Sequence, residues 1–173
     1  MTVTIRPKRM RLYRGDIWDK LRLKHEIVIP VNIGWKKTGE NIMGRGLAKQ
    51  ALERYPKIAS FLGNYQRDFW EHTHCPMGNY HWIIKYPWAP LTFFPTKPLL
   101  VEKPWLSWSQ QSDEKMIKEL LPHLPDYADR HGIKKIAVPV LGAGNGGLDY
   151  GTMVNLIRDT VVDSRFVLVT HLF

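Results

Sequence analysis

A short apolar run followed by closely spaced glycines constrains this chain more than any other feature. Residues 134–150 read KKIAVPVLGAGNGGLDY, in which the run ends in a glycine-rich loop and a helical pattern begins near Tyr150. A strand, glycine loop and helix in this order offer backbone N–H groups to a phosphate, because glycine allows close approach and positive φ. The spacing of Gly142, Gly144 and Gly147 also fits the dinucleotide motif G-x-G-x-x-G.

The length of the chain argues against a dinucleotide-binding fold. A Rossmann fold needs several further strand–helix units after its glycine turn. Only 26 residues follow Gly147, enough for one helix and one strand. The sequence therefore favours a phosphate-binding loop without the dehydrogenase architecture.

A second glycine loop occurs earlier in the chain. The apolar run at 27–31 ends at Asn32, and MGRGLA at 43–48 then opens a helical segment that reaches about Tyr55. Two such loops suit a ligand that carries a diphosphate with a sugar on either side. The helical segment has an amphipathic face formed by Ala48, Ala51, Leu52 and Tyr55.

Strand and helix patterns alternate along the chain, which predicts an α/β sheet covered on both faces. Pro122 and Pro125 should kink or split the long third helix. The segment 97–111 has no clear period and is either a lid or a packed surface loop. We expect strands at 10–13, 26–32, 80–85, 91–95, 133–138 and 166–171, and helices at 46–54, 57–69, 113–130 and 152–162.

Composition is that of an ordinary folded protein. The 173 residues fit one domain that buries about two-thirds of its unfolded surface. The single cysteine, Cys75, excludes an internal disulfide and suits a reducing cytosol. No apolar run approaches the roughly 20 residues of a membrane span, and no hydrophobic segment follows the basic N-terminus as in a secretory signal. We expect a cytoplasmic monomer without a membrane partner.

Histidines and a cysteine gather at 71–81, but no second cluster completes a zinc site of familiar spacing. We therefore expect neither a metal nor a cofactor.

Several motifs, in order, resemble those of macrodomains, the ADP-ribose-binding fold. RGDI at 14–17 resembles their opening GDI motif, and Asn32 resembles the asparagine that closes their next strand. MGRGLAKQALERYP at 43–56, FFPTK at 93–97 and IAVPVLGAGNGGLDY at 136–150 are similar to the subgroup that includes DarG-type antitoxin and terminal ADP-ribose glycohydrolase macrodomains.

This resemblance extends from about residue 11 to residue 173. It implies a single three-layer α/β/α macrodomain over 1–173, with a mixed central sheet. It also implies ADP-ribose binding and hydrolysis of the bond to the distal ribose, which removes ADP-ribose from a modified acceptor, preferably DNA or a nucleobase. An ADP-ribose 1″-phosphate phosphatase and a non-catalytic reader remain as alternatives. The implied partners are an ADP-ribosylated substrate, single-stranded DNA and an ADP-ribosyltransferase toxin.

The resemblance assigns the parts of ADP-ribose to different motifs. Asp16 would accept from the adenine amino group beside a backbone contact at Ile17, although by itself Asp16 is equally a helix cap or turn residue. Asn32 suits the hydroxyls of a ribose. The other predicted contacts are Gly44, Arg45, Gly46 and Leu47 in the first loop, Thr96, and Leu141, Gly142, Ala143, Gly144, Asn145, Gly146 and Gly147 in the second.

Lys97 is the candidate catalytic residue. It follows the apolar strand end FFPT, so its amine should enter a cleft, where desolvation lowers the pKa of a lysine and makes it a usable nucleophile or base. The resemblance implicates this lysine in cleaving the bond to the distal ribose C1″. Gly146 stands where terminal ADP-ribose glycohydrolase has a partner aspartate, so we expect slow turnover. Lys97 would then be a nucleophile, an electrostatic aid or a plain phosphate contact.

Basic and aromatic residues point to a nucleic-acid partner. The net charge is +9, and aromatic side chains surround Lys97 in the sequence. Single-stranded nucleic acid binds to aromatic rings flanked by lysine and arginine. The alternative is that most rings are core and the charge aids solubility. The basic cluster is Arg6, Lys8, Arg9, Arg11 and Arg14, and the aromatic group is Trp82, Tyr86, Trp88, Phe93, Phe94, Trp105 and Trp108.

Overall fold

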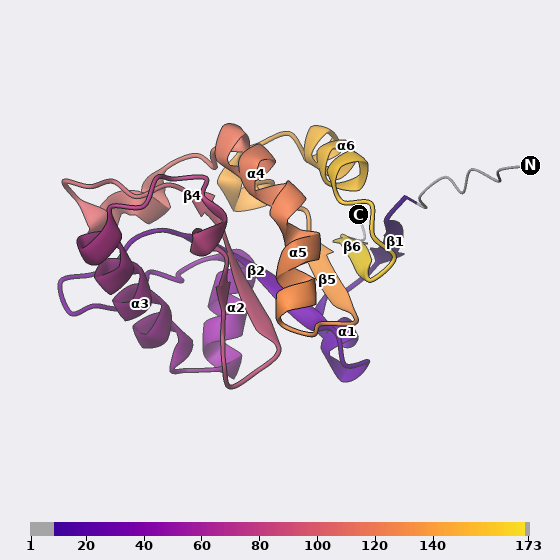
Figure 1. Cartoon of the computed structure of the whole chain (residues 1–173), viewed down its shortest axis with the longest axis horizontal. Coiled ribbons are helices and arrows are strands. Elements are labelled where there is room, and N and C mark those ends of the chain that lie inside the picture. Colours follow the sequence, from indigo (N-terminus) through magenta and orange to yellow (C-terminus); the bar gives the residue numbers. More distant parts are fainter. Residues whose placement is uncertain (1–8, 172–173) are drawn as a thin grey trace, which may run out of the picture.

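The computed structural model describes residues 9–171 as an α/β structure, shown in Figure 1. The strands are β1 (Arg11–Arg14), β2 (Glu26–Asn32), β3 (Ile84–Lys85), β4 (Leu91–Lys97), β5 (Ile136–Pro139) and β6 (Phe166–Thr170). The α-helices are α1 (Trp18–Arg22), α2 (Gly46–Arg54), α3 (Ile58–Thr73), α4 (Glu114–Leu120), α5 (Leu124–Arg130) and α6 (Tyr150–Thr160). Short 3₁₀ helices are η1 (Tyr80–Trp82), η2 (Pro104–Ser109), η3 (Leu121–His123) and η4 (Gly144–Gly146).

The strands form one mixed sheet in the order β1-β6-β5-β2-β4-β3. Along this order, the first five strands pair parallel with their neighbours. Among residues 9–171, the β3–β4 pair is the antiparallel one. The predicted mixed sheet is confirmed. Because five strands run in the same direction, their carboxyl ends meet along one edge, where ligands of such sheets bind.

Alternating side chains of β2 divide the core into two layers. Ile27, Ile29 and Val31 pack with residues of α1, α2 and α3, whereas Val28 packs with residues of α4, α5 and α6. Helices therefore cover both faces of the sheet, as Figure 1 shows, and the predicted three-layer arrangement is confirmed. No helix among residues 9–171 is long and apolar enough to cross a membrane.

Two local expectations need correction. The region 80–85 holds a 3₁₀ turn before a two-residue strand, because the Asn79 side chain accepts from the backbone N–H of His81 at 3.0 Å and begins the turn. The helix α1 was not expected, since its five residues are too few to show a helical period. The long third helix is split into α4, η3 and α5 at Pro122 and Pro125, as expected.

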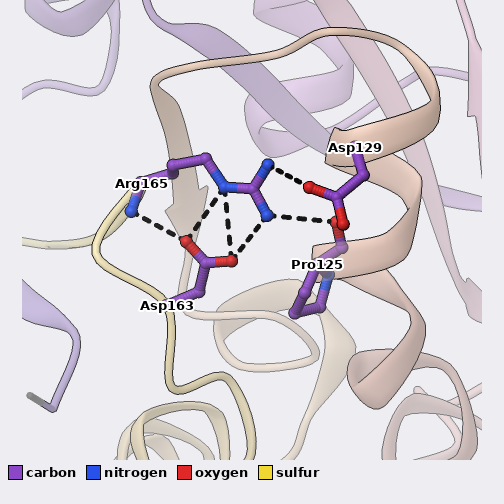
Figure 2. Close-up of polar contacts among 4 residues, drawn as sticks. All are labelled: Pro125, Asp129, Asp163 and Arg165. Carbon is purple, nitrogen blue, oxygen red and sulfur yellow. Dashed lines mark hydrogen bonds and ion pairs between the residues drawn. The ribbon is translucent and has the colours of Figure 1, made fainter. Parts of the chain in front are cut away.

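Arg165 ties the start of β6 to α5, as Figure 2 shows. Its guanidinium donates to Asp163 Oδ2 at 2.6 Å, to Asp129 Oδ1 at 2.6 Å and to the Pro125 carbonyl at 3.2 Å. The Arg165 hydrogen bonds hold the pKa of the Asp163 carboxyl below its usual range. Bidentate arginine–carboxylate pairs of this kind contribute more than single exposed ion pairs.

We expect Arg165→Met to lower the free energy of unfolding by about 2 kcal/mol, because charged hydrogen bonds are lost. Arg9→Met removes an exposed pair with Asp159 and should cost at most about 1 kcal/mol. Because the folded pKa of Asp163 is depressed, its stabilisation is present above the ordinary aspartate pKa and is lost as pH falls through the folded value. Urea denaturation of both variants at several pH values measures the two effects. Equal losses of unfolding free energy in Arg165→Met and Arg9→Met would refute the stabilising role of the Arg165 contacts.

Candidate functional site

A cavity of about 750 Å³ opens at the carboxyl edge of the sheet. The loops after β1, β2, β4, β5 and β6 all contribute to its lining. Both glycine loops line it, one at 43–48 and the other at 142–146, and they approach each other where a Cβ at Gly46 would lie 3.2 Å from Asn145 Nδ2. The parallel sheet thus brings together motifs that lie about a hundred residues apart in the sequence.

Most of the predicted site residues line this one cavity. Leu141 and Gly147 do not: the Leu141 side chain is fully buried in the core, and the Gly147 carbonyl accepts from Gln111 Nε2 at 3.1 Å. The predicted residues that do line it are Asp16, Ile17, Asn32, Gly44, Arg45, Gly46, Leu47, Thr96, Lys97, Gly142, Ala143, Gly144, Asn145 and Gly146.

The first glycine loop presents the amino end of α2 to the cavity. Arg45 is the N-cap residue, and its side chain makes no capping hydrogen bond. The first backbone N–H groups of a helix have no intrahelical acceptor and, with the helix dipole, favour an anion. Gly46 begins α2 with φ of +55°, a conformation that a residue without a side chain adopts readily.

A buried amide network holds the loop that leads to α2. Asn41 Nδ2 donates to the Asn32 carbonyl at 3.0 Å and to the Gly34 carbonyl at 2.9 Å, and Gln66 Nε2 donates to the Asn32 carbonyl at 2.9 Å. The Asn32 side chain donates to the Ile42 carbonyl at 2.9 Å. Asn32 therefore fixes the loop as well as lining the cavity. Sequence reasoning missed Asn41 and Gln66, which share no motif.

The second glycine loop is fitted against the segment before α4. The backbone N–H of Ser112 donates to the Gly146 carbonyl at 2.8 Å, and a Cβ atom at position 146 would lie 3.1 Å from Ser112 Cβ and closer still to Ser112 Oγ. An aspartate at 146 would therefore crowd Ser112, whose side chain would have to shift to admit it. Asp149 does not replace it, because its carboxylate caps α6 by accepting from the Thr152 N–H at 2.9 Å.

Lys97 is the last residue of β4, and its side chain is half-buried. Its Nζ atom donates to the Trp108 carbonyl at 2.7 Å. Burial lowers the pKa of Lys97, and the nearby positive charge of Arg45 lowers it further. Among residues 9–171, the one carboxylate that lines the cavity is Asp16. The geometry thus gives an amine that is easier to deprotonate than an ordinary lysine.

The Asp16 carboxylate, near the end of β1, has a local structural partner. Its Oδ1 accepts from the backbone N–H of Trp18 at 2.9 Å, so the expected turn-capping role is present. The same exposed side chain lines the cavity beside Ile17 and His171. His171 and Trp108 are lining residues that sequence reasoning did not include in the site.

Comparison with solved structures identifies the fold to which this architecture belongs. The macrodomain of Thermus aquaticus DarG is 26% identical, with a TM-score of 0.64 over 92% of this chain and 96% of that one. The protein has the macrodomain fold. The macrodomain of Mycobacterium tuberculosis DarG is 25% identical, with a TM-score of 0.63 over the same shares. Scans of protein-family models and of curated proteins give no match.

A third solved structure similar to this macrodomain contains a ligand. Thermosipho africanus DarTG in complex with ADP-ribose is 22% identical, with a TM-score of 0.58. The match covers 83% of this chain and 37% of that longer one. At this identity the likeness shows the fold.

The aromatic group around Lys97 divides into two sets in the macrodomain. Trp82, Tyr86, Phe93 and Phe94 are buried in the core, so most of the group serves packing. Trp88 and Trp105 are 72% and 38% exposed, and Trp108 lines the cavity. In the predicted basic cluster, Arg6 and Lys8 lie outside the described residues, Arg9 pairs with Asp159, and Arg11 and Arg14 are exposed.

We expect Gly146→Ala to destabilise the protein by about 1–3 kcal/mol through crowding against Ser112. Ser112→Gly removes both crowding atoms. In that background, the loss of unfolding free energy caused by Gly146→Ala should be less than half of its value in the protein that keeps Ser112. Gly146 is not in the positive-φ region, so backbone strain does not contribute. A double-mutant cycle by chemical denaturation measures the coupling, and strictly additive effects would contradict it.

Proposed function

We propose that this macrodomain binds ADP-ribose in its cavity and hydrolyses the bond between the distal ribose and a modified acceptor. The observation that carries the proposal is that two glycine loops and the Lys97 amine share one cavity. The likeness to DarG macrodomains and to a DarTG structure that holds ADP-ribose supports the choice of ligand.

The chemistry of the lining suggests how ADP-ribose is oriented. The diphosphate lies between the amino end of α2 and the second glycine loop, where N–H groups converge. Adenine lies beside Ile17, with Asp16 Oδ2 accepting from its exocyclic amine while Oδ1 keeps the Trp18 N–H. The distal ribose is then directed toward Lys97, at the opposite side of the diphosphate.

Lys97 has two possible roles in hydrolysis. As a nucleophile, the neutral amine bonds to C1″ as the C1″–acceptor bond breaks, losing a proton while the acceptor gains one. Opening of the ribose ring then gives an imine, and water hydrolyses it to release ADP-ribose and restore the amine. As an electrostatic aid, the protonated lysine stabilises the departing acceptor while water attacks C1″. The crowding at Gly146 favours a mechanism without a partner carboxylate in that loop.

The acceptor that we favour is DNA or a nucleobase. An ADP-ribose 1″-phosphate phosphatase uses the same diphosphate contacts, and a reader uses them without turnover. Assays in parallel on ADP-ribosylated DNA, ADP-ribosylated protein and ADP-ribose 1″-phosphate separate the three.

We expect Gly144→Glu to weaken ADP-ribose binding by roughly 100-fold or more, because it places a like charge in the diphosphate path. Gly132→Glu is a matched control: Gly144 and Gly132 have φ of +65° and +63°, and a Cβ at either meets no atom within 4 Å. Both variants carry the same backbone strain, but Gly132 follows α5 and lies outside the cavity lining. If a folded Gly144→Glu variant binds ADP-ribose with unchanged affinity in calorimetry, the proposed binding mode is wrong.

Lys97→Ala should abolish hydrolysis of ADP-ribosylated DNA and leave ADP-ribose affinity largely unchanged, because the lysine acts in the transition state. Lys97→Arg keeps the charge without a usable nucleophile, so activity in that variant indicates the electrostatic role. A nucleophilic amine makes the rate rise with pH through a Lys97 pKa below the ordinary 10.5, and borohydride traps its imine. Full activity of Lys97→Ala would refute catalysis by this residue.

A further inference from the structure

The 3₁₀ helix η2 carries two tryptophans at the rim of the cavity. Trp105 and Trp108 lie at positions i and i+3, and side chains at that spacing lie on the same side of a 3₁₀ helix. Trp108 lines the cavity, and its carbonyl accepts from Lys97 Nζ. Trp105 is 38% exposed and is not among the lining residues. The pair therefore leads from the candidate catalytic amine outward to solvent.

Each of these rings has a cation beside it from the loop between β2 and α2. The Arg45 guanidinium lies 5.0 Å from the centroid of Trp108, and Lys37 Nζ lies 5.6 Å from the centroid of Trp105. Both distances are within the range of cation–π attraction. The side chains of Lys37 and Arg45 are exposed. The two rings and the cation beside each of them form a strip of aromatic and positive groups.

Close packing and hydrogen bonds hold η2, which carries the two tryptophans, in position. The close approach of η2 to the end of β2 requires Gly34, because a Cβ there would lie 2.5 Å from the Pro104 carbonyl and 2.8 Å from Ser107 Cβ. The fully buried Ser107 accepts from the Leu100 N–H at 3.0 Å, and Gln110 Nε2 donates to the Pro98 carbonyl at 2.7 Å. The segment 97–111 is thus a packed loop, which decides between the two expectations for it.

We propose that Trp105 and Lys37 form the binding platform for the acceptor strand, and that the strand is single-stranded DNA. This inference rests on the proposed function, because it places the acceptor next to C1″ and hence next to Lys97. A nucleotide that neighbours the modified one stacks on Trp105, and a phosphate of the strand meets Lys37. Aromatic rings with cations beside them match a strand that offers bases for stacking and phosphates for charge pairing.

Single-stranded DNA fits this strip better than a protein acceptor. A flat ring recognises the π-face of any base, and stacking needs no defined hydrogen-bond partners. Paired bases in a duplex hide those faces, so the strand must be single. Lys37 is exposed, so its ammonium can meet a phosphate of the strand and release counterions.

The test compares two substrates that share the same ADP-ribose linkage. One is an ADP-ribosylated single-stranded oligonucleotide, and the other is the corresponding ADP-ribosylated mononucleotide without flanking bases. We expect Trp105→Leu to raise KM for the oligonucleotide about 10-fold and to leave the mononucleotide unchanged. Trp105→Phe keeps a ring and should recover most of the loss. Trp88→Leu is the matched control, because that tryptophan is 72% exposed in the β3–β4 turn, at the opposite edge of the sheet from the cavity.

Binding of an unmodified single-stranded oligonucleotide, followed by fluorescence anisotropy, tests the platform independently of turnover. Trp105→Leu should weaken it about 10-fold, and Lys37→Gln should reduce the dependence of log affinity on log salt by about 0.7. The same losses in a protein that fails to bind or hydrolyse ADP-ribose would support the platform and refute only the proposed function. Equal affinity in Trp105→Leu and Trp88→Leu, equal losses on the mononucleotide, or an equal rise in KM for an ADP-ribosylated peptide would overturn the inference.

Discussion

The buried amides of Asn41 and Gln66 at the end of β2 are the interaction on which the rest of the site depends. They satisfy backbone carbonyls where the strand stops, which is where an unpaired polar group would be costly. They also fix the direction in which the chain leaves the sheet. The position of α2, the seat of η2 against Gly34 and the reach of Arg45 to Trp108 all follow from that direction.

The electrostatics around Lys97 differ from those of a lysine paired with a carboxylate. Its hydrogen-bond acceptor is the neutral Trp108 carbonyl, and the charged neighbour that affects its pKa is Arg45, which disfavours protonation. A carboxylate beside the amine would instead hold it in the charged form. Cationic groups in the same cavity also suit a diphosphate, so the arrangement fits both parts of the proposed function, ligand binding and the supply of a neutral amine.

Sequence patterns predicted the repeating parts of this macrodomain and missed the parts without a period. The apolar run of β2 and the amphipathic face of α2 gave their observed bounds, Glu26–Asn32 and Gly46–Arg54. The resemblance of the motifs located the two glycine loops on one cavity. Asn41, Gln66 and Ser112 could not be found this way, because each acts through a partner distant in sequence. Which tryptophans are core likewise depends on packing, which composition does not encode.

The contact between Gly146 and Ser112 has an evolutionary consequence. A loop aspartate differs from glycine by a single nucleotide in the codon, so mutation offers it readily. The crowded hydroxymethyl group of Ser112 makes that step unfavourable until the serine itself changes. We therefore expect substitutions at 112 and 146 to be coupled, so that the order in which they arise matters.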